Sequence, residues 1–223
     1  KHPGIPPEAA RLKQPKIKQL SPEPTMVQAL LLTTDQRIVQ SGITWQQFQQ
    51  IRNGFGDSRR VRLFYHDHTV EILMPGREHE FFKSIIGFLI ELFCLETNLE
   101  FEPLGSTTQE REGEAAAEPD ESYCFGSSHP IPDLVVEVIF SSGNISKLQR
   151  YQALGIPEVW FWEDGVFSLY RLERNQLAYA HIKQSKIPEL NTLDMQLLGR
   201  CVLMAQTSRL EAAIALRLAV RNS

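Results

Sequence analysis

The spacing of apolar residues along the chain changes several times, and four stretches have the spacing of a helix. An apolar residue every three or four positions predicts helices over 44–53, 78–96, 147–155 and 208–220. The second of these has the broadest apolar face and is expected to pack most extensively. Thr44 is a suitable N-cap for the first helix, and Gly155 a suitable stop for the third.

Other stretches alternate in polarity or are continuously apolar, which is typical of strands. The alternating pair 59–67 and 69–75 predicts a hairpin, and the polar stretch 107–118 predicts a loop. The remaining predicted strands are 99–105, 123–125, 134–140, 158–164 and 167–172. Helices interleaved with strands predict a mixed α/β fold. Six prolines make residues 1–27 an N-terminal arm, which leaves 28–223 as one expected domain.

Composition narrows the class of protein only slightly. The 223 residues are 42% hydrophobic and carry a formal net charge of −4, as in an ordinary globular protein and unlike a basic nucleic-acid coat. The three cysteines are widely spaced and favour a reducing, cytoplasmic setting. The apolar run 81–95 contains Lys83 and Glu91 and is too short to span a bilayer, so no membrane association is expected.

One carboxylate stands out because it interrupts the most apolar strand, LVVEVIF. Glu137 could face solvent from an edge strand or form a buried ion pair. If Glu137 is buried, its desolvation costs on the order of several kcal/mol, unless the carboxylate is paired or holds a cation. Asp133 lies about 13 Å along the same strand, too far to share a metal ion with Glu137. Asp120 is the better partner, because it lies on the preceding strand and could meet Glu137 across about 5 Å.

Lys147 opens the next predicted helix and could lie over this acidic pair. There it would neutralise the carboxylates, orient an attacking water and stabilise developing negative charge. A solvated lysine in the first helical turn is the alternative.

Several segments together are similar to a known family. EPD (118–120), PDLVVEV (132–138), KLQRY (147–151) and GIPEVWFW (155–162) resemble the Uma-type family of restriction-endonuclease-like proteins, within the PD-(D/E)xK nuclease superfamily. The upstream EILMPGREHEFF (71–82) also fits, so the resemblance covers about 44–172.

The resemblance implies a restriction-endonuclease-like core, with a mixed central β-sheet flanked by helices. It implies that Asp120 and Glu137 are metal ligands and that Lys147 is the catalytic lysine, displaced from the usual superfamily position, which is Ile139 here. An additional acid is expected from the start of the first core helix, where Glu80 and Glu78 are candidates. His79 matches a family position without a defined role, and Tyr151 is expected to pack.

These observations predict an endonuclease that hydrolyses DNA with Mg²⁺ or Mn²⁺. Two alternatives stay open: a catalytically degenerate binding or oligomerisation module, and a phosphodiesterase that acts on RNA or small nucleotides. Leu210, Ala213, Ile214 and Leu218 form an apolar stripe that is expected to pack on its own domain, with a homodimer seam as the alternative.

Overall fold

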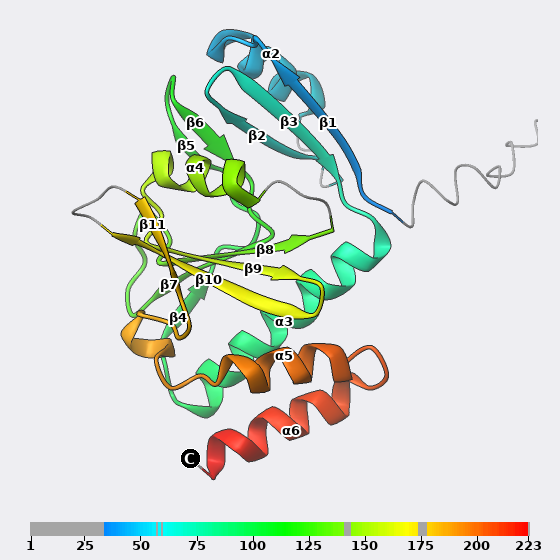
Figure 1. The fold of residues 1–223 in the computed structure, drawn as a ribbon, viewed down its shortest axis with the longest axis vertical. Helices are drawn as coiled ribbons and strands as arrows, with labels where there is room; N and C mark the ends of the chain where they lie inside the picture. The colour runs from blue at the N-terminus through cyan, green and yellow to red at the C-terminus, as the bar shows by residue number, and fades with distance from the viewer. Residues whose placement is uncertain (1–33, 57, 59, 141–143, 174–177, 223) are drawn as a thin grey trace, which may run out of the picture.

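A computed structural model describes residues 34–56, 58, 60–140, 144–173 and 178–222. In this part of the chain, five α-helices pack around two β-sheets (Figure 1). The helices are α2 (Trp45–Phe55), α3 (Arg77–Glu96), α4 (Asn144–Leu154), α5 (Met195–Met204) and α6 (Arg209–Arg221), with a 3₁₀ turn, η1, at Pro188–Leu190.

The N-terminal sheet has the strand order β1-β3-β2-β6-β5 and is antiparallel throughout. Its strands are β1 (Gln36–Ser41), β2 (Arg62–His66), β3 (Thr69–Met74), β5 (Gln109–Arg111) and β6 (Ala115–Ala117). Helix α2 covers one face, where Phe48 packs with Leu63 and Tyr65. Thr44 caps this helix with a reciprocal capping box to Gln47.

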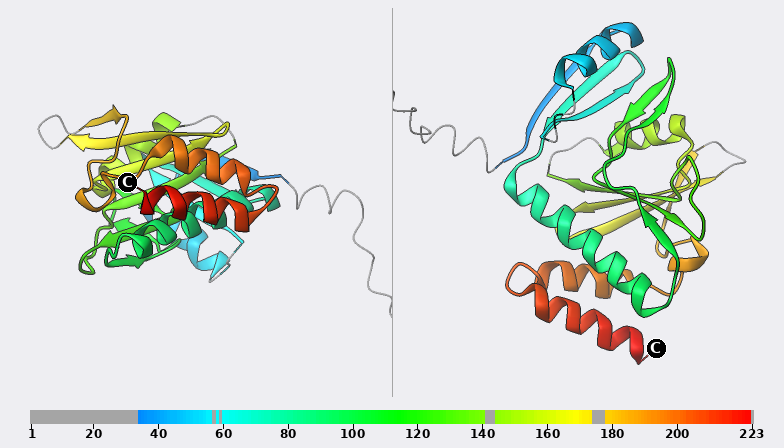
Figure 2. Two further views of the ribbon diagram at one scale, coloured as in Figure 1. Left: turned by 90° about the horizontal axis from the view of Figure 1, so that it is seen from below. Right: turned by 180° about the vertical axis from the view of Figure 1, so that it is seen from behind.

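The central sheet has the strand order β11-β10-β9-β8-β7-β4. Its strands are β4 (Phe101–Pro103), β7 (Glu121–Phe125), β8 (Leu134–Ile139), β9 (Glu158–Glu163), β10 (Val166–Glu173) and β11 (Ala178–Ile182). Strand β8 is antiparallel to β7 and parallel to β9, and α4 makes the crossover between β8 and β9. Helices α3, α5 and α6 lie on one side of the sheet, and α4 with the N-terminal sheet lies on the other (Figures 1 and 2).

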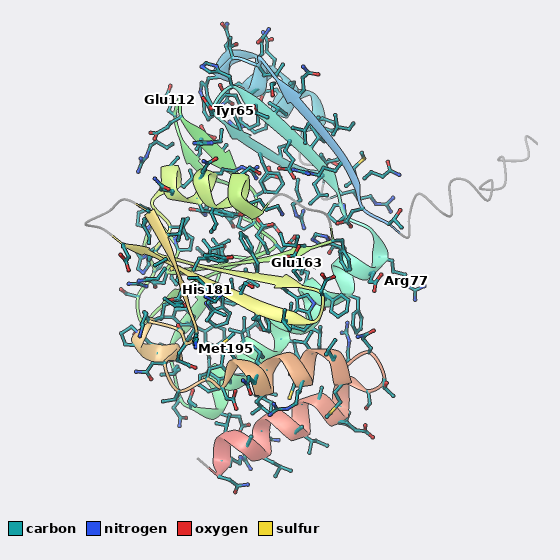
Figure 3. The ribbon with its side chains drawn as sticks, viewed as in Figure 1. Tyr65, Arg77, Glu112, Glu163, His181 and Met195 are labelled. Carbon is teal, nitrogen blue, oxygen red and sulfur yellow. The ribbon has the colours of Figure 1, made fainter. Side chains whose placement is uncertain are left out.

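The two faces of β8 bury different side chains. Val136 and Val138 pack with α3, α5 and the tryptophans of β9, whereas Val135 and Ile139 pack with α4 and the N-terminal sheet. Every side chain of β8 is buried, which explains its continuously apolar sequence. By alternation, Glu137 shares the face of Val135 and Ile139, between β8 and α4. Side chains fill the layers on both sides of the central sheet (Figure 3).

Helix α3 directly follows β3 and runs along one side of the central sheet (Figure 2). In its middle, Gly87 allows a close approach to β7. A Cβ at this position would lie 3.1 Å from the Tyr123 hydroxyl and 3.3 Å from the Glu121 carboxylate. The middle of α3 is thereby held close to β7.

Most predicted elements are confirmed, including the hairpin, whose turn places Asp67 and His68 at positive φ. The prediction of a loop over 107–118 is wrong, because β5 and β6 form a short hairpin there. Helix α4 begins at Asn144, so Lys147 lies one turn inside the helix and does not open it. Besides β5 and β6, the elements β1, β11, η1 and α5 were not predicted. The proline-rich arm, 1–27, falls outside the described residues.

The expected packing of the C-terminal stripe is also wrong. Ala212 and Leu216 form the buried face of α6, whereas Leu210, Ile214 and Leu218 are exposed. Among the described residues, no helix combines the length and apolar character needed to cross a membrane.

Candidate active site

Glu137 lies at the centre of a buried polar network between β8 and α4. Its side chain is 1% exposed. Lys147 Nζ donates to Glu137 Oε2 at 2.7 Å, and the Tyr151 hydroxyl donates to Oε1. Because residues four apart share one face of a helix, α4 presents both donors to the same carboxylate. Burial of Glu137 is therefore compensated by a cation and a hydroxyl.

Asp120 directly precedes β7 and lies opposite Glu137. The β7–β8 register pairs Glu121 with Val136, and its continuation pairs Asp120 with Glu137. Directly opposed residues of antiparallel strands project from the same face, with Cβ atoms about 4.5–5.5 Å apart. Asp120 is 2% exposed, and its Oδ2 accepts a hydrogen bond from the Val138 amide at 2.8 Å. The structure thus brings together the three predicted groups, Asp120, Glu137 and Lys147.

His79 connects the first turn of α3 to this pair. Its Nε2 lies 2.9 Å from both carboxylate oxygens of Asp120, and its Nδ1 lies 2.8 Å from Asp35 Oδ2. Carboxylates only accept hydrogen bonds, so both ring nitrogens must donate, which requires the imidazolium form. Burial lowers the pKa of His79, but the Asp120 and Asp35 carboxylates outweigh this effect and raise it to about 10.

The two site carboxylates differ in electrostatic environment. Burial raises the pKa of Asp120, but the charge and hydrogen bond of His79 overcome this effect and hold it below the usual value. Burial raises the pKa of Glu137, and the neighbouring Asp120 charge adds to this, against the opposing effect of Lys147. Asp120 is thus the more firmly ionised carboxylate, and Glu137 the more basic one.

A second chain of ion pairs adjoins the first. Glu71 of β3 accepts from Arg150 Nη2 and from Arg37 Nε, each at 2.8 Å. Burial raises the pKa of Glu71, but Arg150, Lys147 and Arg37 together lower it to about 2. The Arg150 guanidinium carbon lies 4.4 Å from the centre of the Phe64 ring, and Lys147 Nζ lies 5.8 Å from it. Arg150 and Lys147 therefore face the same small region.

The other candidate acids lie apart from these contacts. Glu80 is half-exposed, and its oxygens are 3.6 Å from Arg62 and from Lys83. Glu78 is an exposed residue of the same first turn. Asp133 accepts from the Phe125 amide at 2.9 Å and pairs with His129 at 3.0 Å, in the turn before β8.

Six participants were not assigned a role in the site from the sequence: Asp35, Arg37, Glu71, His79, Arg150 and Tyr151. Glu71 carried the same signal as Glu137, a carboxylate within the strand pattern TVEILM. Arg150 and Tyr151 follow Lys147 by three and four positions, which places them on its helix face. His79 gave no signal of its own beyond its position in the resemblance, because its partner is 41 residues away.

An acidic pair on adjacent strands and a lysine on the following helix lie together, as the resemblance to restriction-endonuclease-like proteins implies. The comparison with family models agrees: residues 45–205 match the Uma2 model, described as "Putative restriction endonuclease". This match covers well over half of the chain, so the chain belongs to the Uma2 family.

A solved structure described as a "putative nuclease belonging to DUF820", from Anabaena variabilis, shares the fold. The match has a TM-score of 0.51 at 13% sequence identity and covers 72% of this chain and 99% of the other. No curated protein matches the chain. The restriction-endonuclease-like fold class is therefore confirmed.

Proposed function

We propose that this protein is an Mg²⁺-dependent endonuclease that hydrolyses DNA phosphodiester bonds at Asp120, Glu137 and Lys147. The observation that carries the proposal is the buried meeting of two carboxylates from adjacent strands with the Lys147 ammonium, 2.7 Å from Glu137. Burial of such charges costs free energy of desolvation. Buried charged groups with shifted pKa values are common at functional sites. Membership of the Uma2 family supports the same reaction class.

The donor set suits Mg²⁺, although it is small. Among the described residues, no group of three or more His, Cys, Asp or Glu side chains is placed to hold a metal. Mg²⁺ is usually bound by one or two carboxylates, with waters and substrate phosphates completing the shell. Asp120 and Glu137 supply two carboxylates, whose oxygens keep lone pairs beyond the hydrogen bonds described above. A bound Mg²⁺ would polarise the phosphate and lower the pKa of a water.

The side chains of α4 have separate tasks in this proposal. Lys147 neutralises Glu137, orients the attacking water and stabilises the charge that develops on the phosphate. Tyr151 fixes the Glu137 carboxylate by donating to its second oxygen. His79 fixes Asp120 in the same way from α3. A substrate would thus meet carboxylates that are already oriented.

Arg150 supports phosphate binding at this place. It is 5% exposed, and its Nε and Nη1 atoms have no hydrogen-bond partner among the described residues. A buried donor without a partner costs about 1–3 kcal/mol. A phosphate oxygen that reached these groups would satisfy them with charge-assisted hydrogen bonds.

The test is cleavage of supercoiled plasmid DNA by purified protein with Mg²⁺ or Mn²⁺. The unmodified protein is expected to produce nicked and linear DNA, and Asp120→Asn and Glu137→Gln are expected to lower the rate by at least about 100-fold, as for loss of a principal catalytic group. Lys183→Gln, at an exposed residue of another surface, is the matched control. Equal cleavage by all four proteins would disprove the proposed site.

One observation favours the catalytically degenerate module. The network already pairs each carboxylate with a cation, so it is electrostatically complete without a metal. In that case the protein would bind no Mn²⁺ at the pair and would leave plasmid intact with either metal. Parallel assays with RNA and with a cyclic dinucleotide distinguish a DNA endonuclease from a phosphodiesterase that acts on RNA or small nucleotides.

A further inference from the structure

A polar cleft of about 750 Å³ opens beside the Asp120 end of the candidate site. Three cationic residues from three elements line it: Arg52 of α2, Arg62 of β2 and Lys83 of α3. Ser106 and Thr108, from the segment between β4 and β5, add hydroxyl groups. The cleft is therefore built from the N-terminal sheet, two helices and the segment that connects β4 to β5.

This cleft adjoins the site through direct contacts. The Ser106 hydroxyl, which lines the cleft, donates to the Asp120 carbonyl at 3.1 Å. Glu80, another lining residue, follows His79, whose ring bonds the Asp120 carboxylate. Because Asp120 and Glu137 are almost fully buried, a substrate needs a solvent-filled path to them. The cleft provides a solvent-filled space of about 750 Å³ on the Asp120 side, through which a substrate can approach the site.

The charges of the lining suit a polyanion. The whole chain has a net charge of −4, whereas the lining has three cationic residues against two acidic ones, Glu80 and Glu118. Arg62 and Lys83 are each 3.6 Å from Glu80, which is long for an ion pair, and the Glu80 side chain is 48% exposed. The Arg62 and Lys83 side chains are only 8% and 16% exposed, so the open side of each pair is that of Glu80. An incoming phosphate can compete with Glu80 for both cations through charge-assisted hydrogen bonds. Arg52 pairs with Glu110 at the rim.

We propose that this cleft binds the sugar–phosphate backbone of a DNA strand next to the bond that is cut. The inference rests on the proposed nuclease function, since it assigns a path for the same substrate. Arg52, Arg62 and Lys83 contact phosphates. Such contacts position the strand without reading its sequence. When the cleft holds no DNA, the Glu80 carboxylate pairs with Arg62 and Lys83, and it therefore competes with phosphate for these two cations.

The test measures binding of a fluorescein-labelled DNA duplex by anisotropy, with EDTA present so that cleavage is blocked. Lys83→Gln and Arg52→Gln are each expected to weaken binding about 3- to 10-fold at low salt and to reduce the salt slope by about one. Glu80→Gln is expected to have the opposite effect, because it removes a competing carboxylate, and to tighten binding about 2- to 5-fold. Lys183→Gln is the matched control and should bind like the unmodified protein.

Opposite signs for Lys83 and Glu80 distinguish a phosphate surface from a merely structural one, since loss of folding would weaken binding in both variants. Thermal denaturation of each variant checks that the fold is intact. The inference is overturned if the unmodified protein does not bind DNA, or if Lys83→Gln and Arg52→Gln bind like it. If those variants lose binding but no metal supports cleavage, the cleft stands and the proposed chemistry fails. If the protein cuts DNA and the cleft variants bind and cut equally well, the chemistry stands and the cleft assignment fails.

Discussion

The imidazole of His79 shows how one residue sets the state of the whole site. Its two nitrogens donate to Asp120 and Asp35, and the pKa of about 10 keeps it charged at neutral pH. A charged His79 holds Asp120 ionised and oriented toward the face of β8 that carries Glu137. His79 is thus a positioning residue for Asp120 in the proposed mechanism.

We predict that the contribution of His79 to stability decreases at alkaline pH. A histidine whose pKa is higher in the folded than in the unfolded protein contributes fully below about 6.5, the unfolded value, and progressively less as pH rises toward 10. The difference in unfolding free energy between the unmodified protein and His79→Gln should therefore shrink by on the order of a few kcal/mol from pH 6 to pH 10. Urea denaturation at several pH values measures this difference.

His181→Gln, at an exposed histidine, is the control for general effects of pH. A His79→Gln penalty that stays constant between pH 6 and pH 10 would show that the ring is neutral in the folded protein. It would also contradict the assignment of both ring nitrogens as donors.

At the residue scale, the sequence pointed to the acids and the lysine of the proposed site more clearly than to the side chains that contact them. Glu137 was recognisable because a carboxylate inside LVVEVIF has a high cost of burial. Asp120 followed from the turn that brings two strands together. Asp35 and Arg37 could not be inferred, because their contacts with His79 and Glu71 depend on tertiary pairing across more than 30 residues.

At the scale of elements, the Arg37–Glu71–Arg150 chain joins β1 and β3 of the N-terminal sheet to α4. Glu71 and Arg150 are both buried, with side-chain exposures of 4% and 6%. Removal of one member of a buried pair leaves an uncompensated charge. This chain therefore fixes the helix that carries Lys147 against the N-terminal sheet.

We predict that Glu71→Gln lowers the free energy of unfolding by about 3–5 kcal/mol at pH 7. The pKa of Glu71 is about 2, below its ordinary value, so the stabilisation is present above about 4.5 and is lost as pH falls toward 2. Chemical denaturation at pH 7 and pH 3 measures both effects. Glu110→Gln, in the partly exposed pair with Arg52, should cost less than about 1 kcal/mol. Equal losses for the two variants would refute a special role for Glu71.

The elements that the sequence predicted and those it missed differ in burial. Strand β8 and helix α3 bury long apolar patterns, and both were found from sequence. Strand β1 is almost entirely exposed and has a mixed sequence, QRIVQS, so no alternation marks it. Strands β5 and β6 have three residues each and exist through pairing with each other and with β2. Short or exposed strands depend on their neighbours and have weak local signals.

At the scale of the whole molecule, the site lies where two sheets and two helices meet. The central sheet supplies Asp120 and Glu137, α4 supplies Lys147, α3 supplies His79, and the N-terminal sheet supplies Glu71. The general architecture of the central sheet was predictable, because helix and strand periods alternate along the chain. The position of the N-terminal sheet above α4 was not, since it depends on buried ion pairs between distant residues.

The balance of charge in this network sets the central question about its function. Four carboxylates are bonded by four cationic side chains: Asp35, Glu71, Asp120 and Glu137 by Arg37, His79, Lys147 and Arg150. A divalent cation at Asp120 and Glu137 adds two positive charges to a neutral cluster. Metal binding should therefore release protons, because ligand groups and their neighbours change protonation when a metal binds.

Calorimetric titration of the protein with Mn²⁺ at pH 7.5, in two buffers of different ionisation enthalpy, tests this account most directly. We predict saturable binding in the unmodified protein, a heat that depends on the buffer because protons are released, and loss of binding in Asp120→Asn and in Glu137→Gln. Absence of binding to the unmodified protein, or equal binding to both variants, would contradict the assignment of this carboxylate pair as the metal site.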